Sequence, residues 1–137
     1  KVVMKSLFEN WRGYMSEAKD SDSVSKAVII KEDGALLLLR SAEEKFPHKW
    51  DLPGGHIHVD EDPKDGLIRE VEEETGVTLV EPIEKLYTED NITFYKARMP
   101  DGVITLSHEH EEHKFVTRDN IPDNISGKFK RAIKKAL

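Results

Sequence analysis

The sequence contains no cysteine among its 137 residues. A disulfide framework, a zinc site built from thiolates and a cysteine nucleophile are therefore all excluded. This composition fits the reducing cytoplasm, and we expect a cytoplasmic protein. The sequence also lacks an apolar run long enough to span a membrane, and no signal-like apolar stretch opens it, so we expect no membrane association.

Basic residues are outnumbered, with 21 Lys and Arg against 27 Asp and Glu, which gives a formal net charge of −6. This balance argues against broad, non-specific binding to nucleic-acid phosphates. An acidic protein that handles a polyphosphate would need metal ions between itself and its substrate. The length suits one domain with a single core, and it leaves a homodimer open.

The chain divides into a short extension and one domain. Residues 3–18 carry an apolar stripe at helical spacing, and they predict an amphipathic N-terminal helix within an extension of residues 1–20. Residues 21–137 then form the main domain, in which strands come first, a helix is inserted, further strands follow and a helix comes last. This order predicts a mixed α/β or α+β layered domain.

The strands are predicted from β-branched and apolar runs between turn residues. Residues 23–31 and 35–40 are expected to form a β-hairpin with a tight turn at Asp33 and Gly34. Further strands are expected at residues 77–90, 91–99 and 103–107.

The inserted helix has well-marked ends. Asp62 can cap its N-terminus, Pro63 suits the first helical position, and Gly76 can end it in a left-handed conformation. Leu67 and Val71 lie four residues apart and are expected to face the core.

Four glutamates gather near the end of this helix, at positions 70, 72, 73 and 74. Like charges three or four residues apart destabilise an isolated helix by about 0.2–0.5 kcal/mol per pair. Glu70, Glu73 and Glu74 also present hard oxygen ligands on one face, of the kind that Mg²⁺ or Mn²⁺ prefers. The pattern therefore predicts a divalent-cation site, and a solvated acidic helix is the alternative.

The spacing of residues 55–77 is more specific than the acidic cluster alone. It fits G-x(5)-E-x(7)-R-E-U-x-E-E-x-G-U, with U a bulky aliphatic residue, at all nine fixed positions. Those positions are Gly55, Glu61, Arg69, Glu70, Val71, Glu73, Glu74, Gly76 and Val77. The stretch resembles the Nudix box, the signature of the Nudix (MutT-like) hydrolases. His58 and Asp60 depart from the family, whose members often carry Glu and Gly there.

The resemblance implies a fold and a chemistry. The fold would be an α/β/α sandwich, with a mixed β-sheet between helices. The reaction would be hydrolysis of a nucleoside diphosphate linked to another moiety, with Mg²⁺ or Mn²⁺ as cofactor and metal-activated water attacking phosphorus. By position, Glu70, Glu73 and Glu74 would be metal ligands, with Glu70 also a candidate general base. Gly54 would contribute its carbonyl to the metal, and Arg69 would orient Glu70.

Residues 108–113, "HEHEEH", form a second cluster. Their spacing does not match H-E-x-x-H, and we interpret them as a loop that brings one more carboxylate to the box. Counted back from Phe115, where the family often has Trp, Glu109 falls at the position of the family's loop glutamate, and the resemblance implies that it would be a catalytic metal ligand. Glu112 is its rival, and a transition-metal site at the histidines is the less favoured alternative.

The substrate is less well defined by the sequence. His56, beside the two glycines, is interpreted as a substrate-binding residue. Tyr95 lies 18 positions after Val77, near where dinucleoside polyphosphate hydrolases of the family tend to place a tyrosine.

The partner is expected to be a small nucleotide. The alternatives are dinucleoside polyphosphate or RNA 5′-end hydrolysis and, from another class, a non-catalytic nucleotide-sensing module. Aromatic residues that could stack on a base are Phe46, Trp50, Tyr87, Phe94 and Tyr95.

Overall fold

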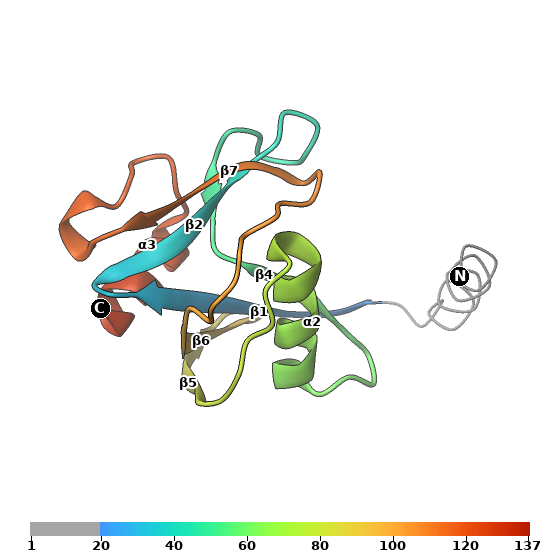
Figure 1. The fold of residues 1–137 in the computed structure, drawn as a ribbon. Helices are drawn as coiled ribbons and strands as arrows, with labels where there is room; N and C mark the ends of the chain where they lie inside the picture. Colours follow the sequence, from blue (N-terminus) through green and yellow to red (C-terminus); the bar gives the residue numbers. More distant parts are fainter. Residues whose placement is uncertain (1–19) are drawn as a thin grey trace.

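The computed structural model describes residues 20–137. The predicted N-terminal helix and extension lie outside this range, apart from Asp20, which begins the first strand. Between residues 20 and 137 no helix is long and apolar enough to cross a membrane. The elements, in chain order, are β1 (Asp20–Lys31), β2 (Gly34–Arg40), β3 (Trp50–Asp51), β4 (Gly54–His58), α2 (Pro63–Thr75), β5 (Ile83–Glu89), β6 (Ile92–Arg98), β7 (His110–Val116), the 3₁₀ helix η1 (Arg118–Asn120) and α3 (Gly127–Ala136) (Figure 1).

The described strands form one seven-stranded sheet whose main path runs β3-β2-β1-β6-β5. Strand β1 lies at its centre, where it pairs in parallel with β6 and antiparallel with β2 and β4. Strand β7 pairs antiparallel with β2. The sheet is therefore mixed, as the sequence predicts.

Both faces of the sheet are covered. Figure 1 shows α2 across one face and α3 behind the other. Neighbouring residues of β1 point to opposite faces, so Ile29 packs under α2 and Val28 under α3. Burial on both faces explains why β2 is a continuous apolar run rather than an alternating one. The predicted α/β/α sandwich is confirmed.

The hairpin between β1 and β2 is confirmed, but its turn lies one residue earlier than predicted. Lys31 pairs with Gly34, so the two turn residues are Glu32 and Asp33, and Gly34 belongs to β2. Glu32 takes a positive φ of 58°. A side chain added at Gly34 would meet the β-carbon of Phe115 at 3.2 Å, so this glycine serves close strand packing rather than the turn.

The strand predicted at residues 103–107 is wrong. This segment belongs to no strand and instead contacts the C-terminal turn of α2, where the Thr105 and Ser107 amides donate to the carbonyls of Thr75 and Glu74. The last carbonyls of a helix lack hydrogen-bond donors within the helix, and residues 103–107 supply donors for two of them. Residues 77–82, predicted as the start of a strand, lie outside β5, which begins only after Pro82.

The helix α2 has the ends that the sequence predicts. The Asp62 side chain accepts from the amides of Lys64 and Asp65, Pro63 is the first residue, and Gly76 ends the helix at φ 77°. Leu67 and Val71 are fully buried in the core beneath it.

Candidate active site

Two glycines let the helix α2 approach strand β4 closely. A β-carbon added at Gly55 would lie 2.5 Å from Glu70 Oε1, so the Glu70 carboxylate rests directly against this residue. Gly54 has a φ of 128°, which favours glycine, and its amide donates to Glu74 Oε1 at 2.9 Å. The glycine pair therefore positions two of the helix carboxylates.

Arg69 connects the carboxylates around it. Its Nε and Nη2 donate to the two oxygens of Glu61 at 2.8 and 3.0 Å, which is a bidentate contact. Its Nη1 donates to Glu70 Oε2 at 3.0 Å and to Glu73 at 3.3 Å, and its Nη2 reaches the carbonyl of His56. Both oxygens of Glu61 are therefore engaged by Arg69, while Arg69 restrains Glu70.

A buried charged network lies behind the helix. Lys26 Nζ donates to Asp51 Oδ1 at 3.0 Å and to the carbonyls of Leu52 and Gly54. Asp51 Oδ2 lies 3.2 Å from His110 Nε2 and 3.2 Å from Arg40 Nη1. These groups join β1, β3 and β7 at the inner end of the site.

The carboxylates of the site differ in their electrostatic environment. Burial raises the pKa of Glu74 well above its ordinary value, against the opposing effect of Lys26. Burial also raises the pKa of Glu70, although Arg69 lowers it. Burial would raise the pKa of Asp51 as well, yet Lys26 and His110 lower it to about 2. Burial therefore disfavours the charged forms of Glu70 and Glu74, whereas Lys26 and His110 outweigh burial at Asp51.

The structure brings Glu109 to the helix carboxylates. Ligand atoms of Glu74, Glu109 and His110 lie within 4.8 Å of one another, a group that can hold a metal ion. Glu112 lies instead on β7, opposite Leu39, and is exposed. His110 starts β7 and is buried, which the sequence did not lead us to expect.

Other residues predicted for the site lie in different environments. Glu73 is exposed at the outer edge of the acidic face. His56 is exposed and lines the same hollow as Glu70 and Glu74. The carbonyl of Gly54, predicted as a metal ligand, accepts from Lys26 Nζ at 3.1 Å. Tyr95 is buried in the core beneath α2 and is not among the residues that line the hollow, and its substrate contact stays a prediction.

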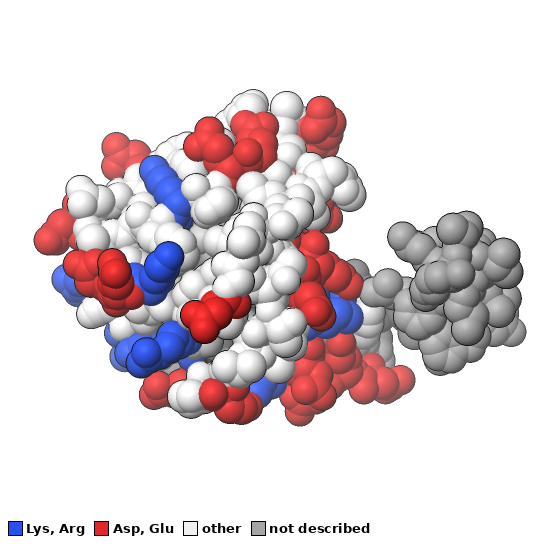
Figure 2. Space-filling model, viewed as in Figure 1, with Lys and Arg blue, Asp and Glu red and all other residues white. Residues whose placement is uncertain are grey.

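The site opens into a hollow of about 810 Å³. Glu70, Glu74 and Glu109 lie in it together with cationic side chains, among them Lys45 and Lys49. Phe46 also lines it and is 72% exposed. In the view of Figure 2, acidic side chains gather over α2, while basic ones lie mainly on the side of the C-terminus.

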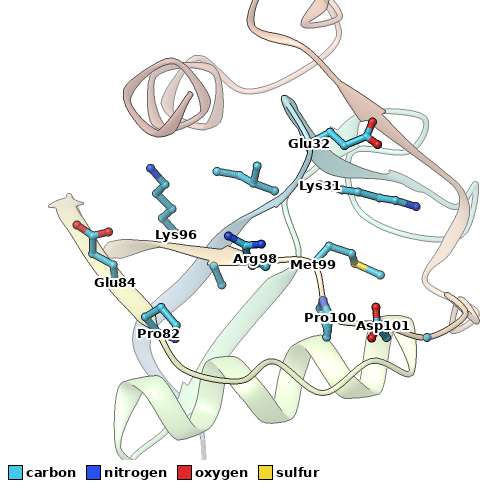
Figure 3. Close-up of a pocket in the computed structure, with 12 residues that line it drawn as sticks. Lys31, Glu32, Pro82, Glu84, Lys96, Arg98, Met99, Pro100 and Asp101 are labelled. Atoms are coloured by element: carbon cyan, nitrogen blue, oxygen red, sulfur yellow. The ribbon is translucent and has the colours of Figure 1, made fainter.

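A second hollow of similar volume lies between the end of β6, the start of β5 and the β1–β2 turn. Figure 3 shows Lys31, Lys96 and Arg98 around it. None of the residues of the box pattern lines it. Gly55, Glu70 and Glu74 of that pattern line the first hollow instead.

Comparisons with known proteins show what this chain is similar to. A family model for the NUDIX domain matches residues 22–136. A MutT-like protein of Streptomyces ambofaciens is 32% identical over 82% of this chain and 79% of its own. The CTP pyrophosphohydrolase of Escherichia coli is 34% identical over 62% of this chain and 68% of its own. The crystal structure of a MutT protein from Methanosarcina mazei has a TM-score of 0.68 at 31% identity, covering 82% of this chain and 89% of that one.

The chain therefore belongs to the Nudix family. It is a Nudix hydrolase, an enzyme that acts on pyrophosphate bonds of nucleotide-like substrates.

Three residues at the inner end of the site were missed by the sequence reasoning, namely Lys26, Asp51 and His110. Lys26 could have been noticed, because a lysine stands directly before the apolar residues 27–30 of a predicted strand. Asp51 and His110 gave no comparable signal, since each follows an exposed loop and their contact spans 59 positions of sequence.

Proposed function

We propose that the protein is a Mg²⁺-dependent pyrophosphohydrolase that cleaves nucleoside triphosphates or related nucleotide pyrophosphates by attack of water on phosphorus. The observation that carries this proposal is the meeting of Glu70, Glu74 and Glu109 in one hollow, against the glycine pair. Mn²⁺ is the alternative ion.

The residues fit a hard divalent cation. Their donor set consists of carboxylate oxygens, which Mg²⁺ prefers. Burial raises the pKa of both Glu70 and Glu74, because it penalises their charged forms. A bound cation would favour those charged forms.

Glu70, Glu74 and Glu109 would hold the metal from the inside of the hollow, and Glu73, which Arg69 also contacts, would be a further ligand from the exposed edge. A bound Mg²⁺ would neutralise diphosphate charge and acidify a water molecule. Glu70, which Arg69 contacts and which lies against Gly55, would be the general base that accepts a proton from the attacking water. Arg69 thus acts through Glu70 as a positioning residue.

The rim of the hollow supports a nucleotide substrate. Lys45 and Lys49 are exposed there and can attract the phosphates that the metal does not cover. Of the five aromatic residues considered for base stacking, Trp50, Phe94 and Tyr95 are buried and Tyr87 packs on Phe94. Phe46 is largely exposed at the rim, so we assign base stacking to it.

The test is a panel of nucleotides with Mg²⁺, with products separated by chromatography. Glu73→Gln and Glu74→Gln should lower turnover by about two orders of magnitude or more, because a metal ligand or its charge is lost. Glu72→Gln is the matched control: this exposed glutamate on the same helix bonds Thr78 instead, and its turnover should stay near wild type.

The same panel separates the rival functions. Water labelled with ¹⁸O should place the label on a phosphate product. Faster cleavage of dinucleoside polyphosphates or RNA 5′ ends would move the assignment to those substrates. Metal-dependent nucleotide binding without any product would favour a sensing module and reject the hydrolase proposal.

A further inference from the structure

Glu109 reaches the first hollow from a short turn rather than from a helix or a strand. One of its carboxylate oxygens lies within 4.8 Å of one of Glu74. No hydrogen bond or ion pair to another residue of the range 20–137 holds the Glu109 carboxylate itself. The direction of this side chain therefore depends on the backbone on either side of it.

Two serines bind all four polar groups of the two peptide units around the Glu109 α-carbon. In the unit before it, the His108 carbonyl accepts from Ser41 Oγ at 2.8 Å. The Glu109 amide of the same unit donates to Ser107 Oγ at 3.3 Å. In the unit after it, the Glu109 carbonyl accepts from the Ser41 amide at 2.9 Å, and the His110 amide donates to the Ser107 carbonyl at 3.3 Å. Because a peptide unit is planar, these bonds fix the direction in which the Glu109 side chain leaves the backbone.

The two serines are anchored on different elements. Ser41 directly follows β2 and is only 6% exposed. Ser107 donates its amide to the Glu74 carbonyl at 3.1 Å, in the last turn of α2. The serines therefore connect the turn that carries Glu109 to the sheet on one side and to the helix of the box on the other.

We propose that Ser41 and Ser107 are positioning residues that hold the Glu109 carboxylate in the first hollow. Neither serine lines that hollow, so both act through the backbone of Glu109. The inference rests on the proposed function, in which Glu109 helps to hold the metal. A small misplacement of a functional group can cost up to about 100-fold in rate, so bonds that orient one carboxylate matter for turnover.

The experiment is a double-mutant cycle between Ser41 and Glu109. It is read by nucleotide turnover with Mg²⁺ and, separately, by the affinity of metal-free protein for Mn²⁺ alone, measured by electron paramagnetic resonance. Ser41→Ala removes the hydroxyl donor of the His108 carbonyl and keeps the amide. It should lower kcat and the Mn²⁺ affinity by about tenfold each. In a Glu109→Gln background the same change should lower either quantity less than about twofold, because no carboxylate is left to misplace.

Ser21→Ala is the matched control. It also removes a hydroxyl that donates to a backbone carbonyl, that of Ile57 at 2.7 Å, and Ser21 does not line the hollow. Its kcat and Mn²⁺ affinity should equal those of wild type. Ser107→Ala removes the acceptor of the Glu109 amide and should repeat the pattern of Ser41→Ala, so it carries the test if Ser41→Ala does not fold.

A tenfold loss that persists in the Glu109→Gln background would assign the serines to general stability and overturn the inference. Wild-type kcat and Mn²⁺ affinity in both serine variants would overturn it as well. Wild-type Mn²⁺ affinity in Glu109→Gln would reject Glu109 as a ligand and the inference with it, while nucleotide cleavage would still stand. If wild-type protein cleaves no nucleotide, the proposed function fails, and the Mn²⁺ cycle alone decides whether the serines position Glu109.

Discussion

At the scale of single residues, the site depends on the close approach of two α2 carboxylates to the two glycines that begin β4. The carboxylate of Glu70 touches Gly55, and the carboxylate of Glu74 is held by the amide of Gly54. A side chain added at either glycine would meet a different kind of obstacle. A β-carbon at Gly54 would come within 2.1 Å of the Ser25 carbonyl, which is rigid backbone. A β-carbon at Gly55 would meet only the flexible end of a side chain.

Gly55→Ala should therefore damage activity more than stability. The added methyl displaces the Glu70 carboxylate by an amount comparable to misplacements that cost up to about 100-fold in rate. We expect at least a tenfold lower kcat and a melting temperature within about 2 °C of wild type. Gly127→Ala is the control, since its β-carbon meets nothing closer than 3.5 Å. Unchanged kcat in Gly55→Ala would mean that the position of Glu70 is not critical.

At the scale of elements, α2 carries most of what the sequence could predict. Its cap, its proline, its terminal glycine and its two faces depend on neighbours within a few positions, so local patterns reveal them. The segment at residues 103–107 shows the opposite case. Its apolar and β-branched residues suit a strand, but its amides bond the end of α2, about 30 positions earlier. No local pattern carries that information.

The N-terminal cap of α2 should have a measurable effect on stability. Asp62→Ala removes the acceptor for the amides of Lys64 and Asp65 and should lower the free energy of unfolding by about 1 kcal/mol. Asp62→Asn keeps an equally good cap and should stay within a few tenths of a kcal/mol of wild type. Urea unfolding measures both. An equal loss of unfolding free energy in Asp62→Ala and Asp62→Asn would assign the effect to the negative charge at the helix N-terminus instead.

At the scale of the whole molecule, the Lys26–Asp51–His110 network ties three strands together behind the site. It is also where prediction from sequence fails most clearly, because the three residues come from positions 26, 51 and 110. The box was recognisable because its residues are contiguous. The charges that complete the site depend on sheet pairing, which single-sequence patterns do not specify.

This network predicts a particular dependence of stability on pH. The folded pKa of Asp51, about 2, is lower than its ordinary value of 3.8, so its ionised form stabilises the fold. That contribution is fully present above about pH 5 and is lost as the pH falls through 4 toward 2.

Asp51→Asn should lower the free energy of unfolding by about 3–5 kcal/mol at pH 7, because Lys26 is left buried without its counter-charge. The difference in free energy of unfolding between wild type and variant, measured with urea, should become smaller as the pH falls from 5 to 3. Asp33→Asn, in the exposed hairpin turn, should show no such difference. A difference in free energy of unfolding that is the same at every pH would show that the charge of Asp51 does not contribute to stability.

The pairing of the sheet has a consequence for how the chain is made. Strand β1 needs β6, whose residues extend to Arg98, and β2 needs β7, which ends at Val116. A ribosome delivers the chain from its N-terminus, so the central strands emerge long before their partners exist. The apolar run of β2 therefore stays exposed until about 80 more residues have left the exit tunnel of the ribosome. Chaperones that bind exposed apolar strands would meet this protein during that interval.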